Sequence, residues 1–248
     1  SEITNGDIQQ WVNDFSISHS PKTVKNAYGL IRAVLDTFAP DIHLRVTLPQ
    51  SIPHQLYVPS DNDIKALLKY FNENDTDMEL AVYLAAFGTL RRSEICALTA
   101  DDVSGNIISV SKAMVTKGNS NWVIKTTKTV SSTRFIEMPD FVVDKFPKSG
   151  KIININPDQI TRRFERVFPK LGIKSFRFHD LRHYAASIMH AIGVPDQYIM
   201  QRGGWSSDKT LKAIYRGTIE EYTQKYTNMT LLHFDNMQHE MQHEIEKA

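Results

Sequence analysis

The residues best suited to chemistry on a phosphate group form one dense cluster at residues 177–184, Arg-Phe-His-Asp-Leu-Arg-His-Tyr. His179 and Arg182 are three positions apart, so they share one face if this segment begins a helix. Both side chains can donate hydrogen bonds to phosphate oxygens, and the planar guanidinium of arginine fits two of these oxygens at once. Taken alone, this spacing is also typical of a helix start whose polar residues cap and pair locally.

Three further residues could take part in the same chemistry. Arg91 follows a glycine turn at Gly88 and opens a predicted helix, an arrangement that can present cations to an anion. Lys128 lies in a predicted hairpin, and Tyr215 lies near the end of a predicted helix. Each has an ordinary structural interpretation as well: a surface arginine at a helix cap, a solvated lysine in a turn, and a core tyrosine. No single one of these signals identifies a function.

Composition excludes several classes of protein. The 248 residues include 41% hydrophobic and 23% charged side chains, which is ordinary globular usage. No run of about 18 apolar residues is present, so no membrane span is expected. One cysteine, Cys96, excludes an intrachain disulfide and a cysteine-rich zinc site. The chain has no glycine-rich Lys-Ser/Thr phosphate loop, no acidic or cysteine cluster for a metal and no signal peptide, so we expect no cofactor, no metal and a cytoplasmic location.

The net charge of +1 does not by itself indicate a nucleic-acid partner. Residues 220–248 contain six acidic and two basic residues, a sum of −4, which leaves +5 for residues 1–219. A modestly basic body with an acidic tail can bind DNA if its cations share one face.

The elements that must position these residues are mostly helical. Two short helices are predicted within residues 1–40, and four prolines between residues 40 and 60 indicate a linker. Further helices are predicted at 61–71, 78–87, 91–98, 157–170, 180–192, 195–202, 207–216 and from 220 onward. Three short strands are predicted at 107–110, 122–124 and 135–138. The fold class is therefore mainly α with a small three-stranded antiparallel sheet (α+β).

The order of these signals, more than any one of them, resembles the tyrosine recombinase (phage integrase) family. Residues 88–95 (Gly-Thr-Leu-Arg-Arg-Ser-Glu-Ile) are similar to its first arginine motif, and 179–183 (His-Asp-Leu-Arg-His) to its second. Residues 203–207 resemble its glycine-rich turn, and Tyr215 stands at the place of its nucleophile. The segment 127–134 is similar to the hairpin of integrases from Gram-positive phages and conjugative transposons. The resemblance covers residues 58–218.

The resemblance implies a role for each matching residue. Tyr215 would attack a DNA phosphodiester and form a 3′-phosphotyrosine, while Arg91 and Arg182 would hold the charge that gathers on the phosphate. Lys128 would protonate the leaving 5′-oxygen, with Lys125 as the alternative general acid.

Three further roles complete the implied site. His179 would hydrogen-bond the phosphate or help to deprotonate the tyrosine. Trp205, where the family more often has histidine, would contact the phosphate and support the site. Glu94 would orient a catalytic arginine by contacting it, without contacting the phosphate itself. Thr89 stands where the family commonly has glycine.

The resemblance also implies an organisation and a set of partners. Residues 1–50 would be the C-terminal part of a helical core-binding domain, truncated at its start, and 51–59 a linker. Residues 60–218 would be the catalytic domain, and 219–248 a tail helix that docks on a neighbouring protomer. The substrate would be double-stranded DNA attachment sites of a mobile element in the bacterial cytoplasm or nucleoid. A homotetramer, with or without accessory DNA-bending proteins, would integrate or excise the element through a Holliday junction.

Two alternatives stay open at this point. A type IB topoisomerase uses similar residues but rejoins the same strand, and a non-catalytic DNA-binding protein would not need Tyr215.

Overall fold

The computed structural model describes residues 3–50, 57–118, 121–126, 133–215 and 227–232. The chain divides into two compact units, Ser1–His54 and Gln55–Ala248. Among the described residues, no helix is both long enough and apolar enough to span a membrane.

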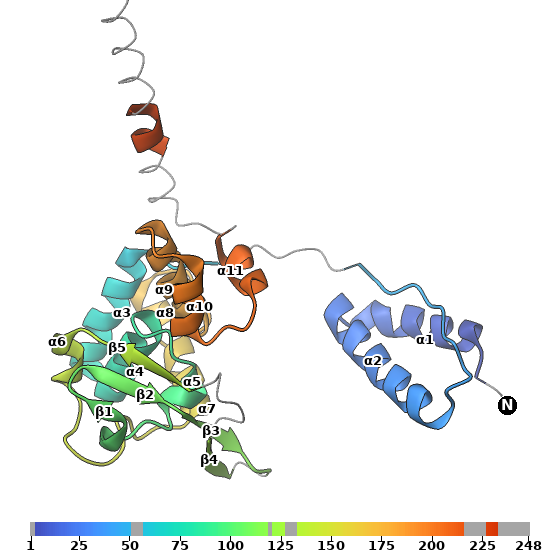
Figure 1. The fold of residues 1–248 in the computed structure, drawn as a ribbon, viewed down its shortest axis with the longest axis horizontal. Helices are drawn as coiled ribbons and strands as arrows, with labels where there is room; N and C mark the ends of the chain where they lie inside the picture. The colour runs from blue at the N-terminus through green and yellow to red at the C-terminus, as the bar shows by residue number, and fades with distance from the viewer. Residues whose placement is uncertain (1–2, 51–56, 119–120, 127–132, 216–226, 233–248) are drawn as a thin grey trace, which may run out of the picture. The chain divides into compact units, whose positions relative to one another are not determined.

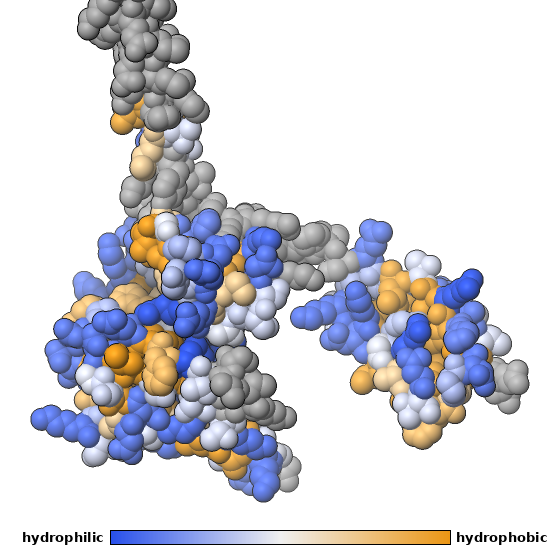
Figure 2. Space-filling view, viewed as in Figure 1, coloured by the Kyte–Doolittle hydropathy of each residue, from blue (hydrophilic) through white to orange (hydrophobic). Residues whose placement is uncertain are grey.

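The first unit is a pair of helices that pack side by side, α1 (Asn5–Ser18) and α2 (Pro21–Phe38) (Figure 1). Thr4 caps α1 in a capping box with Asp7, and Ser20 caps α2, with proline at the first helical position. Their shared core is small, so hydrophobic surface stays in view (Figure 2). The exposed apolar residues of α2 are Leu30, Val34 and Phe38.

The second unit opens with α3 (Asp61–Asn74) and α4 (Thr76–Ala86), followed by the single-turn helix α5 (Arg92–Ile95) and a 3-10 turn, η1 (Ala100–Asp102). Five short strands come next, β1 (Val103–Ser104), β2 (Ile107–Val110), β3 (Lys112–Thr116), β4 (Trp122–Thr126) and β5 (Arg134–Glu137). The remaining helices are α6 (Asp140–Val143), α7 (Pro157–Glu165), α8 (Phe168–Leu171), α9 (Asp180–Ala191), α10 (Asp196–Gly203) and α11 (Asp208–Tyr215). The predicted fold class, mainly α with a small antiparallel sheet, is confirmed.

The strands form two sheets, where the sequence predicts one. The order β1-β2-β5 makes an antiparallel three-stranded sheet, in which Ile108 pairs with Ile136. The strand near 122–124 does not join it; β4 pairs with β3 in a separate hairpin, with Met114 opposite Ile124. This hairpin extends from the body of the unit (Figure 1).

Two predicted helices differ from those observed. The helix expected at 91–98 ends after one turn at Ile95. The helix expected at 157–170 is two helices, because Pro169 lies in the first turn of α8, where it lacks the N–H that a continuous helix would need. Of the tail, residues 227–232 are helical, and the rest lies outside the described residues.

Helix α9 runs through the centre of the unit, since every residue from Asp180 to Ser187 is buried. It packs against α4, α10 and α11. Next to it lies an aromatic cluster in which the Phe164 ring makes edge-to-face contacts with three other phenylalanines, Phe168, Phe176 and Phe178. Burial of such rings supplies much of the stability of a core.

Candidate active site

A single buried carboxylate organises the candidate site. Glu94, whose side chain is 5% exposed, lies one turn after Arg91 at the start of α5. Its Oε2 accepts a hydrogen bond from the Arg91 backbone N–H at 2.8 Å, and its Oε1 accepts one from Arg91 Nη1 at 2.7 Å. The carboxylate therefore closes the helix start and fixes the direction of the Arg91 guanidinium.

A second arginine reaches the same carboxylate from the sheet. Arg134, the first residue of β5, donates from Nη2 to Glu94 Oε2 at 2.8 Å and from Nη1 to Oε1 at 3.1 Å. Burial opposes ionisation of Glu94, but these hydrogen bonds and the nearby positive charges outweigh it and lower its pKa to about 2. The carboxylate is therefore ionised at neutral pH.

A third arginine, Arg182 of α9, is 1% exposed, and its Nη1 lies 4.0 Å from Glu94 Oε2. Its guanidinium donates to the backbone oxygens of Thr89 and Gly203, the latter at 2.8 Å, and lies 4.9 Å from the centre of the Trp205 ring. Burial lowers the pKa of Arg182 to about 9, helped by the charge of Arg91, so the group still carries its proton at neutral pH. Its Nε is buried without a hydrogen-bond partner among the described residues.

Two turns supply the backbone oxygens that hold these arginines. Thr89 adopts the left-handed conformation, with φ of 60°, which is rare for a β-branched residue. Its hydroxyl donates to the Arg202 carbonyl at 2.9 Å, which fixes the turn. In the other turn Gly204 has a φ of 61°, and its backbone oxygen accepts a hydrogen bond from Arg91 Nη2 at 2.9 Å. The strain at Thr89 is thus stored where its carbonyl meets Arg182.

His179 precedes α9, and its ring lies edge-to-face with His183, with 5.1 Å between centroids. Desolvation, followed by the charges of His183 and Arg182, lowers the pKa of His179 to about 4. The residue is exposed overall, so solvent limits the size of this shift; its direction keeps the ring neutral at pH 7.

Asp180, beside it, is buried. Burial would raise its pKa, but contacts with His183 and Arg177 outweigh this effect and lower the pKa to about 2. Arg177 Nη2 donates to Asp180 Oδ1 at 2.8 Å. His183 Nδ1 lies 3.3 Å from the same oxygen but is not aligned for a hydrogen bond.

The structure brings four of the sequence-predicted residues together: Arg91, Glu94, Arg182 and Trp205. Lys128 lies outside the described residues. The alternative lysine, Lys125, is exposed on β4. Tyr215 is the last residue of α11, which packs against α9 and α10, and its side chain lies outside what the structure describes.

Sequence reasoning missed Arg134 as a member of this cluster. The burial alternation of β5 places Arg134 and Ile136 on the inner face, while Phe135 and Glu137 face outward. A charged residue at an inward position of a strand is a signal for a buried ion pair, although a four-residue strand makes that signal weak.

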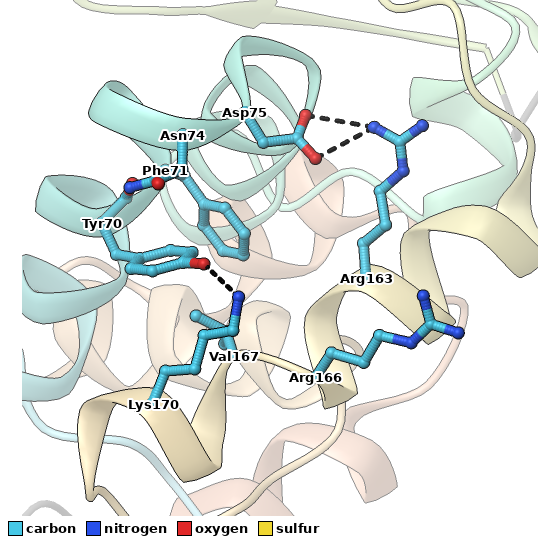
Figure 3. Close-up of a pocket in the computed structure, with 8 residues that line it drawn as sticks. All are labelled: Tyr70, Phe71, Asn74, Asp75, Arg163, Arg166, Val167 and Lys170. Carbon is cyan, nitrogen blue, oxygen red and sulfur yellow. Dashed lines mark hydrogen bonds and ion pairs between the residues drawn. The ribbon is translucent and has the colours of Figure 1, made fainter.

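A separate cleft between α3 and the α7–α8 segment does not contribute to this cluster (Figure 3). Two of its cations have partners: Arg163 donates to Asp75 at 2.9 Å, and Lys170 Nζ donates to the Tyr70 hydroxyl at 2.8 Å. These contacts join the helices across the cleft, so we assign them to packing.

Three arginines that share one carboxylate leave a surplus of positive charge, and chemically such a cluster can attract an anionic group such as a phosphate. Within the described part of the chain, no group of three or more His, Cys, Asp or Glu side chains could hold a metal ion.

Residues 59–221 match the phage integrase family, and the chain therefore belongs to it. An integrase of Mycobacterium phage FRAT1 is 22% identical over 236 residues, 84% of this chain and 69% of the relative. An integrase of Saccharopolyspora erythraea is 36% identical over 66 residues, 27% of this chain and only 15% of that relative's length.

Solved structures share the fold. The Tn1549 transposon integrase in complex with transposon right end DNA has a TM-score of 0.74 at 16% identity, covering 92% of this chain and 85% of that one. A lambda integrase dimer bound to a COC′ core site has a TM-score of 0.64 at 14% identity, covering 87% and 81%. The XerA recombinase has a TM-score of 0.57 at 22% identity, covering 92% and 84%.

Proposed function

We propose that this protein is a site-specific DNA recombinase that cleaves and rejoins DNA through a 3′-phosphotyrosine intermediate. The observation that carries the proposal is the surplus positive charge at Glu94, where Arg91 and Arg182 are fixed by backbone oxygens before any substrate arrives. Donors that are already oriented toward developing charge stabilise a transition state without reorganisation. Among the described residues, the buried Nε–H of Arg182 also lacks an acceptor, which a phosphate oxygen would supply.

In the proposed reaction, the phenolic oxygen of Tyr215 forms a bond to the scissile phosphorus while the bond to the 5′-oxygen breaks. Lys128, or Lys125 in its place, gives a proton to that leaving oxygen. The phenol must also lose its proton, because its ordinary pKa is about 10. Arg91 and Arg182 hold the non-bridging oxygens throughout.

His179 fits this scheme in its neutral form. With its pKa lowered, the ring at pH 7 has one nitrogen that donates and one that accepts. It can therefore donate to a phosphate oxygen from one nitrogen, and accept the phenol proton on the other, which would leave the ring positively charged. A bound phosphate would favour the protonated ring, so proton uptake and substrate binding would support each other.

The partners follow from the same proposal. The Tn1549 and lambda integrases in the matching structures are complexes with DNA, and we extend that partner to this chain. Four protomers on two DNA sites would exchange strands through a Holliday junction, with or without DNA-bending proteins. The tail at 219–248 would dock on a neighbouring protomer. With DNA as its substrate, the protein would act in the bacterial cytoplasm or nucleoid.

The test is covalent trapping. The protein is incubated with a nicked suicide duplex that carries the junction next to its gene, and the products are separated in denaturing detergent. We expect a detergent-resistant adduct with the wild type and with Tyr198→Phe, a matched control at an exposed tyrosine, and none with Tyr215→Phe. An adduct that survives in Tyr215→Phe would mean that another residue is the nucleophile.

Two further outcomes decide between classes of function. Transfer of the trapped strand to a second duplex indicates a recombinase, whereas relaxation of supercoils without transfer indicates a topoisomerase. A gel shift without any adduct contradicts catalysis and leaves a DNA-binding protein.

A further inference from the structure

We infer that Arg134 is a positioning residue that sets the net charge of the phosphate site, an inference that rests on the proposed function. Its side chain is only 4% exposed, and all of its nitrogens are occupied. Nη1 and Nη2 bind Glu94, and Nε donates to the Arg202 carbonyl at 2.8 Å. A guanidinium committed in this way does not touch DNA, so its effect must pass through its neighbours.

The first of these effects is electrostatic. Arg91, Arg134 and Arg182 share the one carboxylate of Glu94, so the cluster carries a formal charge of +2. Without Arg134 the charge would be +1, and Glu94 would be balanced by the two arginines that are proposed to hold the phosphate. Charge interactions inside a protein are screened less than in water, so the loss of one charge within this cluster is felt strongly.

The second effect is geometric. The Arg202 carbonyl that accepts from Arg134 also accepts from the Thr89 hydroxyl, so Arg134 helps to join the two turns that hold the other arginines. Arg134 also lies against Gly204, since a Cβ built there would approach its Nη1 to 3.2 Å. Strand β5 is thereby connected to the turn whose oxygens orient Arg91 and Arg182.

An experiment that varies the charge on the scissile group can separate these two effects from a general loss of structure. Adduct formation is measured in single turnover on two nicked duplexes, one with an ordinary phosphodiester and one with a methylphosphonate at the scissile position. The methylphosphonate replaces a non-bridging oxygen by a methyl group and so removes the negative charge. The ratio of the two rates reports how much the site gains from positive charge, whereas a partly misfolded site slows both reactions equally.

The ratio of the two rates is measured for the wild type and three variants, which together have two values of the formal charge of the cluster. Arg134→Met lowers the formal charge to +1, while Arg134→Lys keeps it at +2. The double variant Arg134→Met/Glu94→Gln also has +2. We expect the ratio to fall on the order of 10- to 100-fold in Arg134→Met, less than the roughly 100- to 1000-fold cost of losing a donor that contacts the reacting group, because Arg134 acts through its neighbours. It should stay within about threefold of wild type in Arg134→Lys and in the double variant, since formal charge is what it follows.

The double variant separates charge from the loss of a side chain, because it lacks Arg134 but keeps the formal charge at +2. It also takes the shared carboxylate from Arg91 and Arg182, so the fold of each variant is checked by urea unfolding before its rates are compared. A matched control is Arg202→Met, which removes a largely buried arginine whose Nη2 binds the Phe87 and Glu137 backbone oxygens rather than a carboxylate. We expect it to lower stability without changing the ratio.

The outcomes are distinct. A wild-type protein that forms no adduct contradicts the proposed function, and the role of Arg134 falls with it. A wild-type adduct together with an unchanged ratio in Arg134→Met overturns the inference on Arg134 alone. The inference is also overturned if the ratio falls as much in Arg202→Met as in Arg134→Met. It is overturned as well if the ratio in the double variant is as low as in Arg134→Met.

Discussion

Glu94→Gln should destabilise the protein by an amount that depends on pH. The carboxyl ionises at a lower pH in the folded chain, near 2, than in the unfolded chain, near 4.5. Its ionisation therefore stabilises the fold above about pH 4.5, and this contribution is lost as the pH falls toward 2. Each pKa unit corresponds to about 1.4 kcal/mol, which gives about 3 kcal/mol at pH 7 and about 2 kcal/mol at pH 3.5. The larger value agrees with the cost of breaking a buried ion pair, about 3–5 kcal/mol.

The assay is urea unfolding of the second unit at the two pH values. A Trp11→Phe background restricts the fluorescence signal to Trp122 and Trp205, which both lie in that unit. The exposed Glu165 provides the control, since Glu165→Gln should change the free energy of unfolding by less than about 0.5 kcal/mol at either pH. A Glu94→Gln effect below about 1 kcal/mol at pH 7, or one of equal size at both pH values, would refute the reasoning.

Three further changes have defined outcomes. Trp205→Ala removes the ring beside Arg182 and should cost about 0.5–2 kcal/mol of stability and slow adduct formation; retention of the full rate would show that the ring does not support the arginine. The ring of His179 should titrate by NMR with a midpoint below 6.5, and protonation as the pH falls from 6.5 should destabilise the fold; a midpoint above 6.5 contradicts the described environment. Phe164→Ala should cost about 3–5 kcal/mol in urea unfolding, while the exposed Phe135→Ala should cost less than about 1; equal costs would contradict the assignment of the core.

Local patterns predicted the parts of the site that depend on short sequence separations. The His179–Arg182 spacing and the Arg91–Glu94 spacing each define one helix turn, and the structure places a helix start at both. The roles in catalysis stay predictions. The Arg134–Glu94 pair spans 40 positions and joins a strand to a helix, so no periodicity of either element contains it.

The sheet was only partly predictable for a similar reason. Residues 107–110 show the alternation of a half-buried strand, which set the correct expectation for β2. In β3 only Met114 is fully buried, so the strand carries little hydrophobic signal, and its pairing with β4 is fixed by the chain reversal between them. Register across a hairpin depends on backbone hydrogen bonds that side-chain patterns do not record.

The arginine cluster also bears on how the protein is made. Its components come from α5, β5, α9 and the turn at Gly203–Gly204, so the contacts bridge up to 113 positions of the chain. Such long-range contacts close late, because each requires the intervening chain to be ordered first. A nascent chain still on the ribosome lacks the Gly203 and Gly204 carbonyls, which accept from Arg182 and Arg91, until residue 204 has been added. A product that ends before these glycines would thus carry both arginine motifs without the two carbonyls that orient their guanidiniums.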